Sequence, residues 1–68
     1  MAYLVIVERG SNSLGAYVPD LPGCAVEGEA REETFDLIRQ AIQIHLDGLR
    51  EAGDPIPEPV SSTELVRV

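Results

Sequence analysis

PDLPGC, residues 19–24, is the stretch that decides how this 68-residue chain folds. Its two prolines and its glycine mark a turn, yet an apolar residue, Leu21, stands inside that turn. Prolines stiffen a loop and reduce the entropy that is lost when its side chains are buried or bound. The stretch therefore predicts a stiff corner between two strands, and it leaves open whether Leu21 packs into the core or faces a partner.

Strand-like segments lie on both sides of this corner. Leu14–Val18 (LGAYV) precedes it and ends at Pro19, which has no N–H to donate to a sheet, and Cys24–Gly28 (CAVEG) follows it. Earlier still, Tyr3–Val7 (YLVIV) is continuously apolar and rich in β-branched residues, which is typical of a strand buried on both faces. The turn residues Gly10–Ser13 predict that the first two strands form an antiparallel hairpin.

A helix is predicted from Arg31 to Ala52, where the apolar period changes from two residues to about 3.6. Gly53 follows as the residue that ends the helix, while Ala30 stands at its start without a side-chain acceptor for the first N–H groups. Gly48 lies within the helix and lowers its stability by about 1 kcal/mol relative to alanine. The apolar stripe consists of Phe35, Ile38, Ile42, Leu46 and Leu49.

The last residues, Ser61–Val68, follow an extended proline-rich connector, Asp54–Pro59, and alternate well enough to predict a fourth strand. The order β-β-β-α-β predicts an α+β fold with a single four-stranded sheet and one helix on one face. A right-handed helical crossover would return the fourth strand beside the first, so that Tyr3–Val7 would be central. One helix covers only one face. The apolar first strand therefore predicts that a second copy covers the helix-free face, in a dimer or a larger homo-oligomer.

The composition restricts the classes of partner. Twelve acidic residues against five arginines and no lysine give a net charge of −7, which argues against direct binding to nucleic acid. The charge favours a basic partner, or it serves solubility alone. One cysteine cannot form an internal disulfide, and the apolar start is too short for a signal peptide or a membrane helix. We therefore expect a cytoplasmic domain, with no membrane contact, that a partner or a second copy stabilises.

No residue pattern supports catalysis or a cofactor. Asp20 and Cys24 lie close together, but the only histidine, His45, belongs to the helix, and turn formation and burial explain the first two residues. No cysteine–histidine cluster has zinc spacing. An acidic cluster surrounds the start of the helix without the loop spacing of a divalent-cation site, and a solvated first turn accounts for it. That cluster consists of Glu27, Glu29, Glu32 and Glu33. No enzyme activity, metal ion or other cofactor is expected.

Three motifs around the single amphipathic helix resemble the HicB family, the antitoxins of prokaryotic HicA–HicB toxin–antitoxin systems. They are AYVPDLPGC (residues 16–24), EGEAREET (residues 27–34) and GDPIPEP (residues 53–59), and together with the helix they cover nearly the whole chain. The resemblance implies a partial ribonuclease-H-like fold. Ribonuclease H enzymes place metal-binding carboxylates on the sheet from the first strand onward, whereas here that strand is apolar and Glu8 only follows it. The likeness therefore does not carry the nuclease activity with it.

The resemblance also implies a function, in which the chain binds and masks a small, basic, HicA-like toxin that cleaves mRNA. The net charge of −7 suits such a partner. Many family members carry a C-terminal DNA-binding domain, but this sequence ends at Val68, so we expect a single HicB-like domain over residues 1–68. The expected contact residues are Tyr17, Asp20, Leu21, Pro22, Glu29 and Glu32.

Two other functions are compatible with the sequence. One is a free-standing homo-oligomeric binding module of the same family that has no toxin partner. The other is a residual metal-dependent nuclease, which is the weaker alternative because the first strand supplies no carboxylate.

Overall fold

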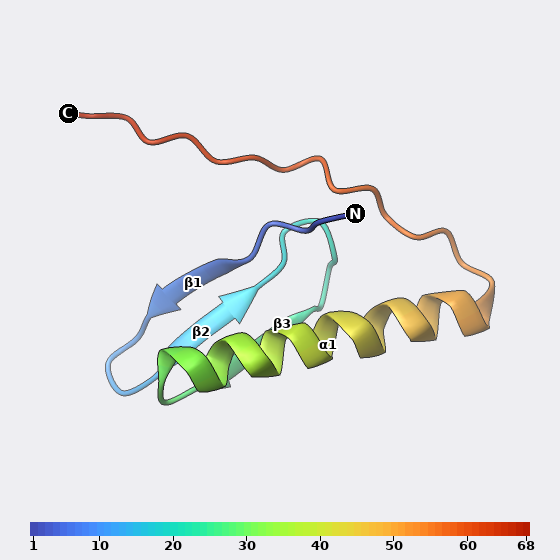
Figure 1. The fold of residues 1–68 in the computed structure, drawn as a ribbon, viewed down its shortest axis with the longest axis horizontal. Helices are drawn as coiled ribbons and strands as arrows, with labels where there is room; N and C mark the ends of the chain where they lie inside the picture. The colour runs from blue at the N-terminus through green and yellow to red at the C-terminus, as the bar shows by residue number, and fades with distance from the viewer.

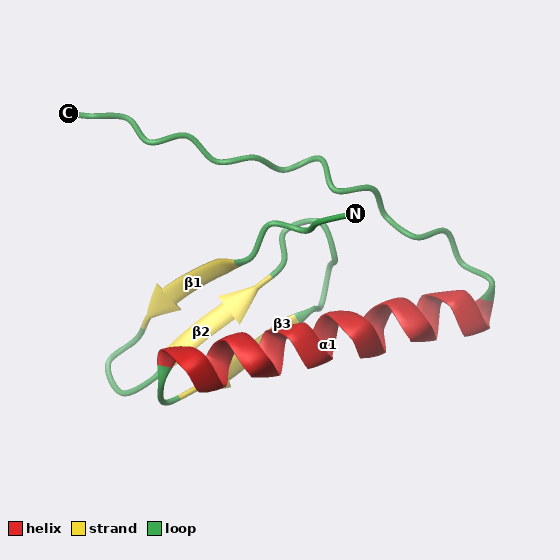
Figure 2. Ribbon diagram, viewed as in Figure 1, coloured by secondary structure: helices red, strands yellow, loops and turns green.

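The computed structural model describes residues 1–68 and contains three strands followed by one helix: β1 (Ile6–Arg9), β2 (Leu14–Tyr17), β3 (Ala25–Gly28) and α1 (Arg31–Ala52). The strands form an antiparallel sheet in the order β1-β2-β3, so that β2 is central. The helix lies along one face of this sheet, over β2 and β3 (Figure 1). Figure 2 shows the two layers and the extended segment that follows the helix. The fold class is α+β, as the sequence predicts.

The sheet register places apolar side chains of all three strands on the face that packs against α1. Val7, Ala16 and Val26 lie opposite one another in adjacent strands and therefore share a face. Ala16 is buried there, and the core cluster continues from it through the corner residues to the helix. The buried core consists of Ala16, Val18, Leu21, Cys24, Ile38 and Leu46. The helix contributes its predicted stripe, of which Ile38 and Leu46 are buried and the other members half-buried.

Two consecutive β-turns form the corner between β2 and β3. The N–H of Leu21 donates to the carbonyl of Val18 at 3.1 Å, and the N–H of Cys24 donates to the carbonyl of Leu21 at 3.0 Å. Pro22 precedes Gly23, whose φ of 84° is what the third position of a type II turn requires. Leu21 is 0% exposed. The question that the sequence leaves open is therefore answered, because this leucine belongs to the core.

The start of the helix is held close to β3 through Gly28, where no room exists for a side chain. A Cβ atom at this position would lie 2.9 Å from Oε1 of Glu33 and 3.3 Å from Cα of Thr34. Thr34 is fully buried, and its hydroxyl donates to the carbonyl of Ala30 at 2.7 Å. The Glu33 carboxylate accepts the N–H of Glu29 at 2.7 Å and replaces part of the cap that Ala30 cannot provide.

The end of the helix matches the sequence prediction. Gly53 adopts the left-handed conformation with φ of 73°, and its N–H donates to the carbonyl of Arg50 at 3.1 Å. The N–H of Asp54 donates to the carbonyl of Leu49 at 2.9 Å, which completes a Schellman motif. The predicted bounds, Arg31–Ala52, are therefore confirmed. This helix is not apolar enough over a sufficient length to cross a membrane.

The predicted four-stranded sheet is wrong, because Ser61–Val68 joins no strand and the sheet has only three. The segment Tyr3–Val7 was expected at the centre of the sheet, but β1 begins at Ile6 and is an edge strand. Alternating apolar residues indicate an extended backbone, and the backbone after α1 is indeed extended (Figure 1). A strand also needs a neighbouring edge that supplies ladder hydrogen bonds, and alternation alone does not specify that edge.

Two glycine-to-alanine substitutions should have opposite effects on the free energy of unfolding. A Cβ atom at Gly48 would meet nothing within 4 Å, so Gly48→Ala should stabilise the chain by about 0.5–1 kcal/mol through helix propensity. Gly28→Ala should destabilise it by about 1–3 kcal/mol, because the helix start must move away from β3. Urea denaturation followed by circular dichroism measures both changes, and a neutral or stabilising Gly28→Ala would contradict this packing.

Candidate functional site

The sheet face that points away from α1 is the candidate site. The register places one residue from each strand in each of two rows across this face. We call Ile6, Tyr17 and Ala25 the apolar row, and Glu8, Gly15 and Glu27 the acidic row. Both rows alternate with the residues that face the helix, so that every side chain in them lies on the uncovered side of the sheet.

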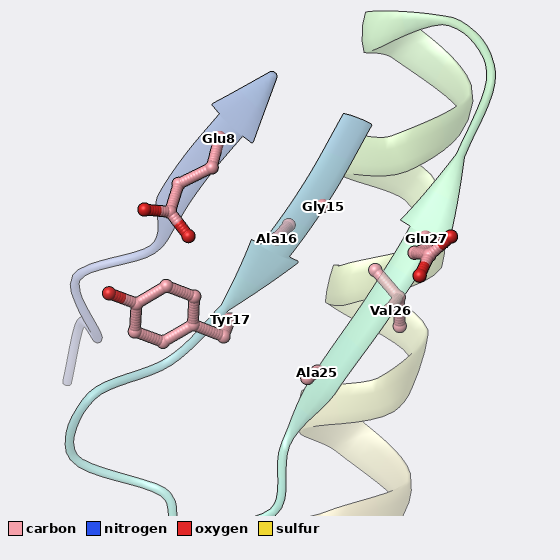
Figure 3. A pocket seen from close by; sticks show the side chains of 7 residues that line it. All are labelled: Glu8, Gly15, Ala16, Tyr17, Ala25, Val26 and Glu27. Carbon is pink, nitrogen blue, oxygen red and sulfur yellow. The ribbon is translucent and has the colours of Figure 1, made fainter. Parts of the chain in front are cut away.

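An open hollow of about 480 Å³ lies over the middle of this face. Gly15 has no side chain and Ala25 has only a methyl group, so the floor of the hollow is largely backbone. In Figure 3 the Tyr17 ring and the Glu8 carboxylate lie on one side of it and the Glu27 carboxylate on the other. A glycine inside a strand often marks a place where another molecule approaches the backbone closely, and Gly15 occupies such a place.

The residues that line the hollow include two carboxylates and no basic side chain. Arg9 lines the adjoining hollow at the end of β1, but it forms no ion pair with Glu8 or Glu27. The two ion pairs of the chain, Arg39–Asp36 and Arg50–Asp47, both lie on α1. Glu27 accepts only a long hydrogen bond, 3.4 Å, from the hydroxyl of Ser13, and Glu8 has no hydrogen-bonded side-chain partner. Because neither carboxylate has a cationic partner within the chain, each can accept hydrogen bonds from an arginine or lysine side chain of another molecule.

The predicted contact residues around the corner differ in how far they are exposed to solvent. Tyr17 is partly exposed on the helix-free face, and Pro22 is exposed at the corner. Asp20 is half-buried, and its two carboxylate oxygens accept the N–H of Ser61 at 3.1 Å and the hydroxyl of Ser61 at 2.8 Å. Direct contact through Leu21 is corrected by the structure, because this side chain is fully buried and has no surface to offer.

The two predicted glutamates lie at the other end of the sheet. Glu29 and Glu32 are exposed where β3 ends and α1 begins, and Glu29 lies beside the turn between β1 and β2. The corner with Pro22 lies where β2 ends and β3 begins, which is the opposite end of the same strands. The structure therefore places the predicted residues at both ends of the helix-free face and does not gather them into one cluster.

Four residues that define the hollow were missed by the sequence prediction. Their position follows from the strand register, which pairs Glu8 with Gly15 and Gly15 with Glu27. The alternation of Glu27 and Ala25 with Cys24 and Val26 was the available signal, but it extends over too few residues to decide a face. The missed residues are Glu8, Gly15, Ala25 and Glu27.

The buried thiol and the carboxylates show no catalytic geometry. Cys24 belongs to the core, and burial raises the pKa of its thiol, so that the reactive thiolate is disfavoured. No three histidine, cysteine, aspartate or glutamate side chains converge as a bound metal ion requires. What this part of the molecule offers is a charged, hollowed surface for contact with another molecule.

Comparison of the sequence with known proteins places this chain in a family. The model of the family described as HicB-like antitoxin of bacterial toxin–antitoxin systems matches residues 3–67. A UPF0150 protein of Thermoplasma acidophilum is 33% identical over 60 residues, which are 84% of each chain. A UPF0150 protein of Helicobacter pylori is 36% identical over 44 residues, which are 65% of this chain and 61% of that protein.

A phage protein is similar over part of its length only. An uncharacterised 14.9 kDa protein in the rep-hol intergenic region of Haemophilus phage HP1 is 29% identical over 58 residues. These residues are 85% of this chain but only 44% of the phage protein, so the chain spans less than half of that relative. No solved protein structure matches this one at a significant level.

The burial of Cys24 has consequences for thiol chemistry and for the pH dependence of stability. In the folded chain, reaction with a disulfide reagent at pH 8 should be at least about tenfold slower than in the urea-unfolded chain. Above the ordinary thiol pKa of 9.0, the unfolded thiol loses its proton while the folded one keeps it. The free energy of unfolding should therefore fall as pH rises past that value, and this part of the fall should be absent in Cys24→Ala. Equal labelling rates in the two states would contradict the burial.

Proposed function

This chain belongs to the HicB-like antitoxin family, and we propose that it neutralises a HicA-like toxin by covering the toxin with its helix-free sheet face. The observation that carries the proposal is the acidic row, in which two carboxylates without cationic partners flank a glycine on an open face. A toxin that cleaves mRNA must itself present a basic surface to its substrate. The antitoxin then acts by binding alone, and catalysis has no part in it.

The hollow has the shape and charge to accept one basic side chain of the toxin. The backbone floor at Gly15 leaves space for the aliphatic stem, while Glu8 and Glu27 accept hydrogen bonds from the charged end. The Tyr17 ring beside the hollow adds a flat apolar surface, over which an arginine or lysine can be held by its attraction to the aromatic face. The net charge of −7 increases the rate at which a basic toxin finds this face.

The ends of the face provide further contacts for a toxin of similar size. A stable interface buries about 800 Å² on each partner, which is more than the hollow alone provides. Pro22 and Asp20 lie at the corner and Glu29 and Glu32 at the helix start, so that the proposed interface extends from one end of the sheet to the other. Leu21 contributes indirectly, because its burial fixes the corner that carries Pro22.

A second copy of the chain is the alternative occupant of the helix-free face. The apolar row supports this occupant, since Ile6 and Tyr17 remain partly exposed there. The acidic row opposes it, because two acidic faces brought together would place the carboxylates of both copies against one another. We propose that the toxin takes this face and that self-association, which would help to stabilise a chain of this size, uses a different surface.

Filling the hollow should weaken toxin binding without unfolding the chain. A Cβ atom at Gly15 would have its nearest neighbours at 4.0 Å, so Gly15→Val fits the strand while it blocks the hollow. Calorimetry with a purified HicA-like toxin of the same organism should show a rise in Kd of about 10–100-fold. Glu8→Gln with Glu27→Gln should give a similar loss and a weaker dependence on salt.

The matched control removes the same charge elsewhere. Glu51→Gln with Glu58→Gln neutralises two exposed carboxylates at the far end of α1 and beyond it, and should leave the Kd within about twofold. If both double variants lost the same affinity for the toxin, the acidic row would contribute only through the net charge of the chain and not through direct contact. A folded wild-type chain that binds no such toxin would overturn the proposed function and leave a free-standing homo-oligomeric module.

A further inference from the structure

The C-terminal segment is extended, apolar and unpaired. We call residues 62–68 the tail. Leu65 is 101% exposed, Val66 76% and Val68 116%. No residue of the tail donates or accepts a hydrogen bond. Leu65–Val68 (LVRV) is rich in β-branched and apolar side chains, and its backbone is extended with free N–H and C=O groups. A free sheet edge can pair with a segment of this kind as an additional strand.

The base of the tail is fixed, so that it leaves the domain at a defined place. Ser61 donates to the Asp20 carboxylate from both its N–H and its hydroxyl group, and the Tyr3 hydroxyl donates to the carbonyl of Pro57. The radius of gyration is 13.2 Å, whereas a compact domain of this length has about 11 Å. Figure 1 shows the tail passing beyond the N-terminus and running away from the sheet layer. The tail is therefore anchored at its base but does not pack against the rest of its own domain.

A matching acceptor lies at the free edge of β1. This strand pairs with β2 on one side only, and its other edge has no strand beside it. The helix packs over β2 and β3 and not over β1, so Val5 and Val7 on the helix side of this edge are only half-buried. Ile6 on the other side is half-buried as well. The edge therefore has unsatisfied backbone groups and apolar side chains on both faces.

We propose that the tail of one copy adds to the free edge of β1 in a second copy, and that the second copy returns its own tail in the same way. Within one copy both elements stay unpaired, while a two-fold pair of copies satisfies both edges by a single reciprocal exchange. Alternation places Leu65 on one face of the added strand and Val66 and Val68 on the other. Ile6 and Val7, which lie on opposite faces of β1, thus both receive apolar neighbours.

This exchange goes beyond the proposed toxin binding and does not depend on it. The added strand lies in the plane of the sheet at the β1 edge, so the hollow around Gly15 in the central strand stays open. Self-association through the tail therefore leaves the helix-free face of each copy available for a basic partner.

Light scattering on the full chain gives the first test. The wild-type chain should be a dimer at micromolar concentration, and Leu65→Glu with Val66→Glu should raise the dissociation constant at least about tenfold, because two charges would have to be buried beside the β1 edge. Leu65 and Val66 are exposed and belong to no core cluster of their own copy, so this variant should keep the helical circular dichroism of the wild type. Gln40→Glu with Gln43→Glu adds the same two charges to the exposed side of α1 and should leave the dimer intact. A dimer that survives the tail variant would overturn the exchange while self-association stands, and a monomeric wild type would overturn both.

Disulfide trapping then separates exchange from pairing within one copy. Chains with Glu8→Cys are mixed with chains that carry either Leu65→Cys or Val66→Cys, which point to opposite faces, and the mixture is oxidised mildly. The native Cys24 is buried and serves as the unreactive background in every chain. A cross-linked heterodimer from the mixture, absent from either chain alone, is the expected result. A disulfide that forms only when both cysteines are in one chain, which then runs as a monomer, would show that the tail pairs with its own β1 and would overturn the proposal.

Discussion

Burial of Leu21 inside the double turn is the contact on which the other parts of this structure depend. Its side chain closes the core at the corner, and its backbone N–H and C=O complete both turns. The corner in turn sets the register of β2 against β3. That register decides which residues reach the helix-free face, and the same corner orients Asp20 toward Ser61 at the base of the tail. One buried leucine thus connects the core with both proposed interaction surfaces.

The two surfaces differ in chemistry and in the partners they fit. The helix-free face combines an apolar row with an acidic row around a hollow, which suits a basic protein surface such as the one proposed for the toxin. The β1 edge and the tail instead offer unpaired backbone and aliphatic side chains, which suit a second copy of the same chain. Because the two surfaces are separate, the proposed self-association and the proposed toxin binding are compatible with each other.

The parts of this structure that the sequence predicts are those that local chemistry determines. The helix was bounded correctly by the period of its stripe and by Gly53, and the turn residues in PDLPGC located the corner. Strand partners depend on distant residues, and for that reason the fourth strand and the central place of Tyr3–Val7 were wrong. Tyr17 was predicted as a contact residue from its position beside the corner, and it lies on the helix-free face. Glu8, Gly15 and Glu27 come together only through the register of three strands, which no single segment of the sequence contains.

The central claim is that the helix-free face is the surface that binds a HicA-like toxin. The most direct measurement is titration of the isotopically labelled chain with that toxin, followed by the amide resonances of each residue. The account predicts that the largest shifts occur at Gly15 and Tyr17, with smaller ones toward Pro22 and Glu29 at the two ends of the sheet. Shifts confined to the outer surface of α1, with the Gly15 amide unmoved at saturation, would contradict it.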